Sequence, residues 1–170
     1  MTLASGVAAE GVSTIVSTGE RSPSLFRRST MSQLREFMHT PLYGCSPSVS
    51  LAMAAREMET HNVGSLVITD QDRILGMITD RDIALAIGRG SGPETPVDQV
   101  STHSVVTIES DADVSDAAAL MGDKGVWRLP VTDGGGRPVG MVSLNDVFGY
   151  LAQETQHLSQ AAHAHRGPLL

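Results

Sequence analysis

The sequence predicts an α/β protein made of two copies of one β-α-β-β-α unit, and two observations lead to this prediction. The segment GMITDRD at residues 76–82 returns 64 positions later as GMVSLND at residues 140–146, with Gly, Met, a hydroxyl residue and Asp at matching places. Helical and extended hydrophobic patterns alternate in the same order around both segments. An internal repeat of this length indicates one supersecondary unit written twice, whose copies share a core.

The match continues upstream of the two segments. Residues 54–70 align with residues 117–133 at a shift of 63, one less than the shift of 64 further along the chain. The difference puts one extra residue into the turn of the second copy, DGGGR against DQDR. A surface turn between two strands tolerates insertions well, so the offset supports a hairpin at this point in each copy.

Each copy begins with a short extended stretch, PLYGC at residues 41–45 and SVVTI at residues 104–108. An amphipathic helix is predicted next, because apolar residues recur at i, i+3, i+4 and i+7 from residue 51 and again from residue 114. Ser50 and Asp113 stand immediately before these helices, where a short polar side chain caps free backbone N–H groups.

Two strands and a second helix complete each copy. The strands are predicted at SLVITD and RILGMI in the first copy and at RLPVTD and RPVGMV in the second, each pair joined by a tight polar turn. The second helices start at Thr79 and Ser143, with Asp82 and Asp146 three residues further on. A hydroxyl residue followed by an acid at this spacing is typical of a capping box, here with Asp in place of Glu.

The pattern divides the chain into five expected parts. They are a mobile N-terminal tail at 1–30, a first repeat at 31–90, a linker at 91–97, a second repeat at 98–152, and a C-terminal helix and tail at 153–170. The first part is rich in Ser, Thr, Gly and Ala without a sustained period. Short helical turns are expected in SQLREFM, before the first copy, and in PVDQV, at the end of the linker.

Composition and charge disfavour several classes of function. The formal net charge of −7 argues against a protein that holds nucleic acid, whose phosphate backbone binds basic surfaces. No apolar run reaches the length of about 20 residues that a membrane helix needs, and the N-terminus lacks the basic region of a signal peptide. The single cysteine, Cys45, is expected to be a small buried hydrophobe. We therefore expect a cytoplasmic protein that binds neither nucleic acid nor membrane.

The doubled pattern, with NVGSLVITD and WRLPVTD ahead of Gly-x-x-[Ser/Thr]-x-x-Asp, resembles the cystathionine β-synthase (CBS) domain, which occurs in pairs called Bateman modules. The resemblance implies that the repeats pack sheet to sheet about a pseudo-two-fold axis, with two clefts that commonly bind AMP, ADP or ATP. Some members bind S-adenosylmethionine, NAD or cyclic dinucleotides instead, and two modules commonly form a disc-shaped dimer. We therefore expect no required cofactor, an adenosine-type regulatory ligand and a homodimer.

The resemblance also implies which residues face each cleft. One cleft takes three residues from the second copy and three from the first: Met141, Ser143, Asp146, Thr40, Val63 and Gly64. The other takes the matching residues with the copies exchanged: Met77, Thr79, Asp82, His103, Val126 and Trp127. A carboxylate can accept hydrogen bonds from both hydroxyls of a ribose, and a helix N-terminus attracts phosphate. Arg81 and Arg128 are further candidates for phosphate contact.

The two clefts are not expected to bind alike. Gly64 leaves room beside a base, whereas Trp127 at the matching place stacks on an adenine, fills the cleft, or is a rim or interface residue. We therefore expect Asp146→Ala to weaken binding more than Asp82→Ala. Helix capping alone also explains the hydroxyl and Asp pairs, and core packing explains the two methionines of the repeated motif.

Other chemistries find little support in the sequence. The stretch GRGSG at residues 88–92 lacks the lysine and the preceding strand of a phosphate loop, and the six histidines lack metal-ligand spacing. No nucleophile has an identifiable base partner. The sequence therefore predicts a non-catalytic module that binds an adenosine-containing ligand and signals by population shift to a separate effector protein. The alternatives are a structural interaction module with empty clefts and an enzyme on this fold.

Overall fold

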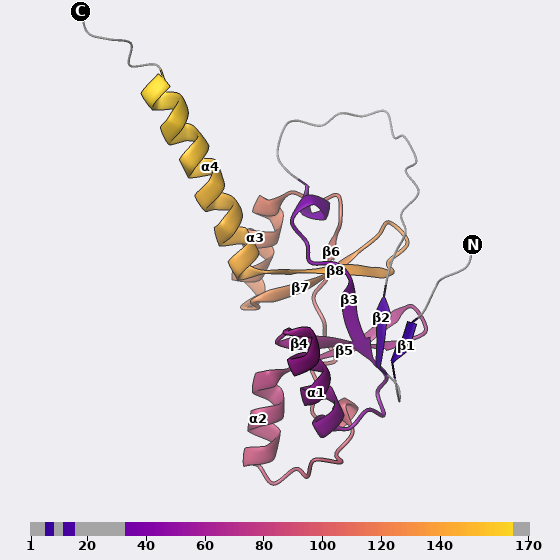
Figure 1. Cartoon of the computed structure of the whole chain (residues 1–170). Helices are drawn as coiled ribbons and strands as arrows, with labels where there is room; N and C mark the ends of the chain where they lie inside the picture. Colours follow the sequence, from indigo (N-terminus) through magenta and orange to yellow (C-terminus); the bar gives the residue numbers. More distant parts are fainter. Residues whose placement is uncertain (1–5, 9–11, 16–32, 165–170) are drawn as a thin grey trace, which may run out of the picture.

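The structure is a computed structural model that describes residues 6–8, 12–15 and 33–164. Its fold is mixed α/β, which confirms the predicted class, and it contains two sheets (Figure 1). The first sheet has the strand order β1-β2-β3-β4-β5, and the second has the order β6-β7-β8. The helices of the two repeats lie at opposite ends of the molecule, with both sheets between them (Figure 1).

The first repeat contains β3 (Leu42–Cys45), α1 (Leu51–His61), β4 (Ser65–Asp70), β5 (Arg73–Thr79) and α2 (Asp80–Gly88). Strand β3 runs parallel to β4, and β4 and β5 form an antiparallel hairpin. The parallel step follows from the crossover helix α1, whose Leu51, Ala54 and Met58 are buried in the core as their spacing predicts. Ser50 caps this helix, because its hydroxyl accepts a hydrogen bond from the Met53 amide.

The second repeat has the same order of elements, which are β6 (Ile108–Glu109), α3 (Val114–Lys124), β7 (Arg128–Thr132), β8 (Pro138–Ser143) and α4 (Leu144–Ala164). Asp113 occupies the N-cap position of α3, and its own amide donates to the side chain of Asp116. Helix α4 is longer than its counterpart α2, and its residues 151–160 are exposed on all sides. This part of α4 projects away from the rest of the molecule (Figure 1).

The two repeats exchange the short 3-10 turns at their N-terminal ends. Turn η1 (Leu34–Glu36) comes at the start of the first repeat, yet Leu34 is buried in the core of the second, among Ile108, Val114 and Leu129. Turn η2 (Val97–Gln99) comes at the start of the second repeat, yet Val97 is buried in the core of the first. Both residues are fully buried, so each half of the protein completes the hydrophobic core of the other.

The N-terminal region differs from the expected tail at two short strands. β1 (Gly6–Ala8) and β2 (Val12–Ile15) form an antiparallel hairpin that extends the first sheet along β3. The rest of the tail expected at 1–30 lies outside the described residues, as do residues 165–170. Among the helices that the structure describes, none combines the length and the apolar character required to cross a membrane.

Candidate functional site

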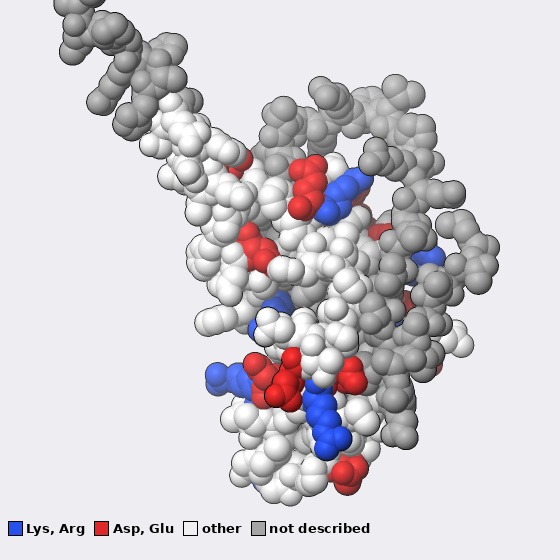
Figure 2. All heavy atoms as spheres, viewed as in Figure 1, with Lys and Arg blue, Asp and Glu red and all other residues white. Residues whose placement is uncertain are grey.

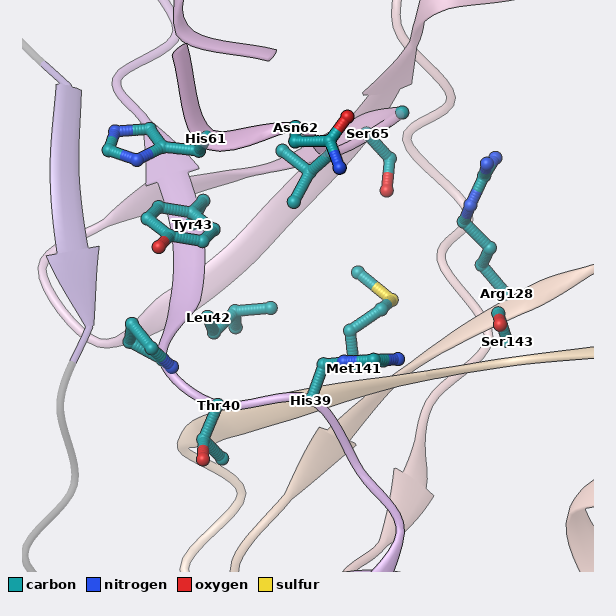
Figure 3. Close-up of a pocket in the computed structure, with 13 residues that line it drawn as sticks. His39, Thr40, Leu42, Tyr43, His61, Asn62, Ser65, Arg128, Met141 and Ser143 are labelled. Atoms are coloured by element: carbon teal, nitrogen blue, oxygen red, sulfur yellow. The ribbon is translucent and has the colours of Figure 1, made fainter. Parts of the chain in front are cut away.

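The main candidate site is a cavity of about 500 Å³ at the junction of the two repeats. Its walls come from β3, from the loop between α1 and β4, and from the two last strands of the second repeat (Figure 3). The lining residues are His39, Thr40, Pro41, Leu42, Tyr43, His61, Asn62, Val63, Gly64, Ser65, Arg128, Met141 and Ser143. A cavity of this volume is in the range of small-molecule sites in proteins.

A backbone bridge joins the repeats at this cavity, between the lining residues His39 and Met141. The His39 amide donates to the Met141 carbonyl at 2.8 Å, and the Met141 amide donates to the His39 carbonyl at 3.1 Å. Gly140, the first residue of the repeated motif, permits this close approach, because a Cβ there would lie 3.0 Å from the His39 carbonyl oxygen. The glycine of the motif is therefore explained by the crossing of the other repeat's chain.

Ser143 and Asp146 form one of the two hydrogen bonds of the capping box that the sequence predicts at the start of α4, from the Ser143 amide to the Asp146 carboxylate. The amide and the hydroxyl of Ser143 both donate to Oδ2 of Asp146, each at 2.7 Å. The second carboxylate oxygen, Oδ1, lies 2.8 Å from Nε2 of His39. Burial raises the pKa of the Asp146 carboxyl, but the Ser143 hydrogen bonds and the His39 ring outweigh burial and bring the pKa below its usual range. Asp146 is thus a carboxylate at neutral pH.

Arg128 brings a positive charge into the same cavity. Its side chain extends from β7 toward the first repeat (Figure 3), and a Cβ on Gly64 would lie 2.8 Å from its Nη2 atom. The space that Gly64 leaves is therefore taken up by this guanidinium. The ion pairs within the described part of the chain do not include Arg128, although the Asp80 carboxylate also flanks Gly64, where a Cβ would lie 3.4 Å from its Oδ2 atom. Arg128 is therefore a candidate for contact with an anion.

The opposite end of the cavity is aromatic and apolar. Tyr43 and His61 stack with their ring centroids 4.1 Å apart and their planes 19° from parallel. Figure 3 shows this pair on the far side of the cavity from Arg128. Leu42, Val63 and Met141 add apolar surface between the two ends. The cavity therefore offers a cationic group at one end, where Ser143 links it to the Asp146 carboxylate, and flat apolar contacts at the other.

The structure brings together the residues predicted for this cleft. Thr40, Val63, Gly64, Met141 and Ser143 all line the cavity, and Asp146 lies directly behind Ser143 through their hydrogen bonds. Four further lining residues were not identified from the sequence, namely His39, Tyr43, His61 and Asn62. His39 and Asn62 directly precede predicted site residues in the chain, so adjacency in the sequence was the available signal.

The residues predicted for the other cleft are less closely gathered. Thr79 and Asp82 form the complete capping box, and Met77 bridges the Thr102 backbone as Met141 bridges His39. However, Asp82 and His103 line two different cavities. Val126 packs against the core of the second repeat. Trp127 is 74% exposed, so it does not fill a cleft, and the structure agrees with a rim or interface position for it.

The described residues offer little support for a metal site, a reactive thiol or a basic binding surface. No group of three or more His, Cys, Asp or Glu side chains in that part of the chain is placed to hold a metal ion. Cys45 is buried, and burial together with the charge of Glu57 raises the pKa of its thiol to about 12. A thiol with this pKa is a poor nucleophile at neutral pH. On the face drawn in Figure 2, acidic and basic side chains are interspersed rather than gathered into one basic patch.

Comparison with known proteins gives consistent matches. An uncharacterized 17.7 kDa protein of Acidianus ambivalens is 38% identical over 109 residues, which cover 64% of this chain and 66% of that protein. The CBS domain-containing protein YhcV of Bacillus subtilis is 36% identical over 118 residues, which cover 69% of this chain and 84% of that protein. The match thus spans just under two thirds of the first relative and most of the second.

A solved structure gives a similar result in three dimensions. The CBS domain pair of protein MJ0100, in complex with 5′-methylthioadenosine and S-adenosyl-L-methionine, superposes with a TM-score of 0.67 at 25% identity. The alignment covers 74% of this chain and 99% of that one. Both of its ligands are adenosine derivatives. The CBS domain family itself matches residues 34–89 and 97–153. With two thirds of its length matched in two successive copies, the chain belongs to the CBS domain family and carries the domain in tandem.

Proposed function

We propose that this protein is a non-catalytic regulatory module that binds an adenosine-containing ligand in the cavity between its repeats, with AMP, ADP or ATP as the first candidates. The observation that carries the proposal is that Ser143, at the start of α4, and Arg128 line one cavity, and that the Asp146 carboxylate is hydrogen-bonded to two of its lining residues, Ser143 and His39. A carboxylate suits a sugar diol, and a helix start beside an arginine suits phosphate. The binding of adenosine derivatives by the similar MJ0100 domain pair supports this choice.

The apolar end of the cavity suits an adenine base. Leu42, Val63 and Met141 offer apolar surface of the kind that lines small-molecule sites, and the Tyr43 and His61 rings stand beyond them. A neutral adenosine derivative such as 5′-methylthioadenosine uses the sugar and base contacts alone. A nucleotide adds the contact of its phosphate with Arg128, so we expect phosphorylated ligands to bind more tightly and with a stronger dependence on salt.

Ligand binding would act through the relative position of the two repeats. The cavity has walls from both repeats, so a bound ligand stabilises the arrangement in which these walls are closest. We propose that a separate effector protein recognises this arrangement. The ligand shifts the equilibrium between this arrangement and a more open one only to the extent that it binds the two with different affinities. A large response therefore requires a large difference in affinity.

We also propose that the protein forms a homodimer through α4. This helix carries exposed apolar side chains within one narrow sector of its surface, namely Leu151 and Leu158 in the projecting part and Phe148 just before it. Leu151 and Leu158 are seven residues apart, the spacing of a seam between two helices. Sedimentation equilibrium should give a dimer for the wild type and a monomer for the Leu151→Lys, Leu158→Lys double variant.

Thermal denaturation with a ligand panel tests the proposed binding. A ligand present at about 100 times its dissociation constant stabilises the folded state by about 2.7 kcal/mol, which is a shift of roughly 5 to 11 °C for a protein of this size. The panel contains AMP, ADP, ATP, 5′-methylthioadenosine, S-adenosylmethionine and NAD. Asp146→Asn should reduce the shift strongly, and Asp82→Asn, the matched change in the other repeat, should reduce it less. No shift with any of the six ligands would overturn the proposal.

A second candidate function is a structural interaction module whose clefts remain empty. The exposed apolar stripe on α4 favours it, because such a surface is suited to a protein partner with or without a ligand. The two functions differ in the denaturation experiment. Under the second, none of the ligands raises the melting temperature, while the double leucine variant still loses self-association.

A further inference from the structure

His39 holds one oxygen of the carboxylate that is expected to bind the sugar. Its Nε2 atom lies 2.8 Å from Oδ1 of Asp146. The His39 backbone is fixed to Met141 by hydrogen bonds of 2.8 and 3.1 Å, whereas 72% of its side chain is exposed. The Asp146 side chain is 17% exposed. The ring can therefore rotate away from Asp146 while the backbone of His39 stays in place.

The contact with His39 reduces the number of hydrogen-bond acceptor sites that Asp146 can offer to a ligand. Each carboxylate oxygen has two lone pairs that accept hydrogen bonds. The amide and the hydroxyl of Ser143 already use both sites on Oδ2. His39 uses one of the two on Oδ1, so a single site remains. A sugar diol that donates both hydrogens to this carboxylate needs two sites, and the second becomes free only when the His39 ring leaves.

The first repeat provides an internal comparison. Asp82 accepts the amide and the hydroxyl of Thr79 on Oδ2, at 2.9 and 2.7 Å, as Asp146 accepts those of Ser143. The residue that bridges the strand there is Thr102, which stands where His39 stands in the other half. Within the described residues, Oδ1 of Asp82 accepts no hydrogen bond. The pairing of the carboxylate with a histidine is therefore a property of one half and not of the repeated fold.

We propose that His39 is a specificity-determining gate that competes with the ligand's 2′,3′-diol for Asp146. The proposal rests on the proposed function and adds a residue that controls it. Apart from Asp146, the titratable or charged side chains that face His39 across the cavity are Arg128, His61 and Tyr43.

The size of the effect follows from the exposure of the pair. Exposed ion pairs and their hydrogen bonds contribute little, so releasing Asp146 from His39 should strengthen diol binding by roughly twofold to fivefold. His39→Thr makes this half resemble the other at the bridging position. Because the side chain is mostly exposed and the bridge uses backbone atoms alone, the variant should fold like the wild type.

The test is calorimetric titration with adenosine, which is uncharged. The ligand 2′,3′-dideoxyadenosine lacks the diol and reports contacts that the gate does not affect. His39→Thr should bind adenosine roughly twofold to fivefold more tightly than the wild type does. The affinity for dideoxyadenosine should not change in the variant.

Three results overturn the proposal and are distinguishable. If His39→Thr weakens adenosine binding or leaves it unchanged, the gate is wrong while ligand binding stands. If the variant strengthens adenosine and dideoxyadenosine equally, His39 obstructs the cavity in general rather than the diol. If neither protein binds adenosine nor any ligand of the panel, the proposed function fails, and the gate fails with it.

Discussion

Gly140 should not tolerate even a methyl group, because the chain of the other repeat crosses directly over it. A Cβ at this position would lie 2.8 Å from Sδ of Met38 and 3.0 Å from the carbonyl oxygen of His39. Ordinary contacts between such atoms are about 3.5 Å or longer, so residues 38 and 39 must withdraw by about 0.5 Å. The Met38 side chain can move alone, but the carbonyl cannot move without its backbone.

The withdrawal affects the bridge between His39 and Met141. Its longer hydrogen bond, now 3.1 Å, would reach about 3.6 Å and be lost. A lost hydrogen bond costs about 0.5 to 1.5 kcal/mol, and overpacking costs about 1 to 3 kcal/mol. We expect Gly140→Ala to lower the free energy of unfolding by about 1.5 to 4.5 kcal/mol, which corresponds to roughly 3 to 18 °C in melting temperature.

The matched control is Gly122→Ala, the same chemical change in the last turn of α3. Gly122 is exposed, and a Cβ there meets no atom within 4 Å. Alanine in a helix is favoured over glycine, so this variant should gain about 0.5 to 1 kcal/mol. Urea denaturation of both variants gives the two changes in stability. A Gly140→Ala protein as stable as the wild type would refute the explanation that Gly140 is required by the close approach of the His39 backbone. Unchanged ligand affinity in that protein would refute the link between the His39–Met141 bridge and the cavity.

Three further predictions concern single side chains. The Cys45 thiol, with its pKa raised to about 12, should react with a thiol reagent far more slowly in the native protein than in urea, as followed by mass spectrometry; equal rates would contradict its burial. Trp127, the sole tryptophan, should show the fluorescence of a solvated indole in the native state, and Trp127→Ala should change stability by less than about 0.5 kcal/mol. The pKa of Asp146 is 3.8 in the unfolded chain and lower in the folded protein. The carboxylate therefore stabilises the folded state above pH 3.8, and this contribution is lost as the pH falls through the lower pKa of the folded state. The stability advantage of wild type over Asp146→Asn, measured by denaturation, should therefore shrink between about pH 7 and about pH 3, and a constant difference would refute the assignment.

Much of the fold was predictable because its signals are local. The spacing of Leu51, Ala54 and Met58 predicted a helix face that the structure buries. The hydroxyl and Asp pairs predicted capping boxes, of which the one at α2 forms completely and the one at α4 forms its bond from the Ser143 amide to Asp146. Each of these patterns depends on atoms that are at most a few residues apart. The internal repeat then extended the same assignment to both halves of the chain.

The candidate site was only partly predictable. The residues of the first cleft came from a family resemblance, and five of those six line one cavity. No pattern in the sequence indicated that Arg128 occupies the space beside Gly64, or that Tyr43 and His61 stack at the other end. The two arrangements depend on side-chain directions across two different repeats, which a single sequence does not encode in any local pattern.

The sequence by itself determined the repeated unit, its helices and strands, and the carboxylate at the start of each second helix. Only the tertiary structure decided that the halves exchange Leu34 and Val97, and that His39 meets Asp146 from 107 positions away. The physical reason is the range of the interactions. Hydrogen bonds within a turn and the periods of helices and strands act between near neighbours in the chain. Contacts between the halves depend on how two folded surfaces fit together, and that fit exists only after both have formed.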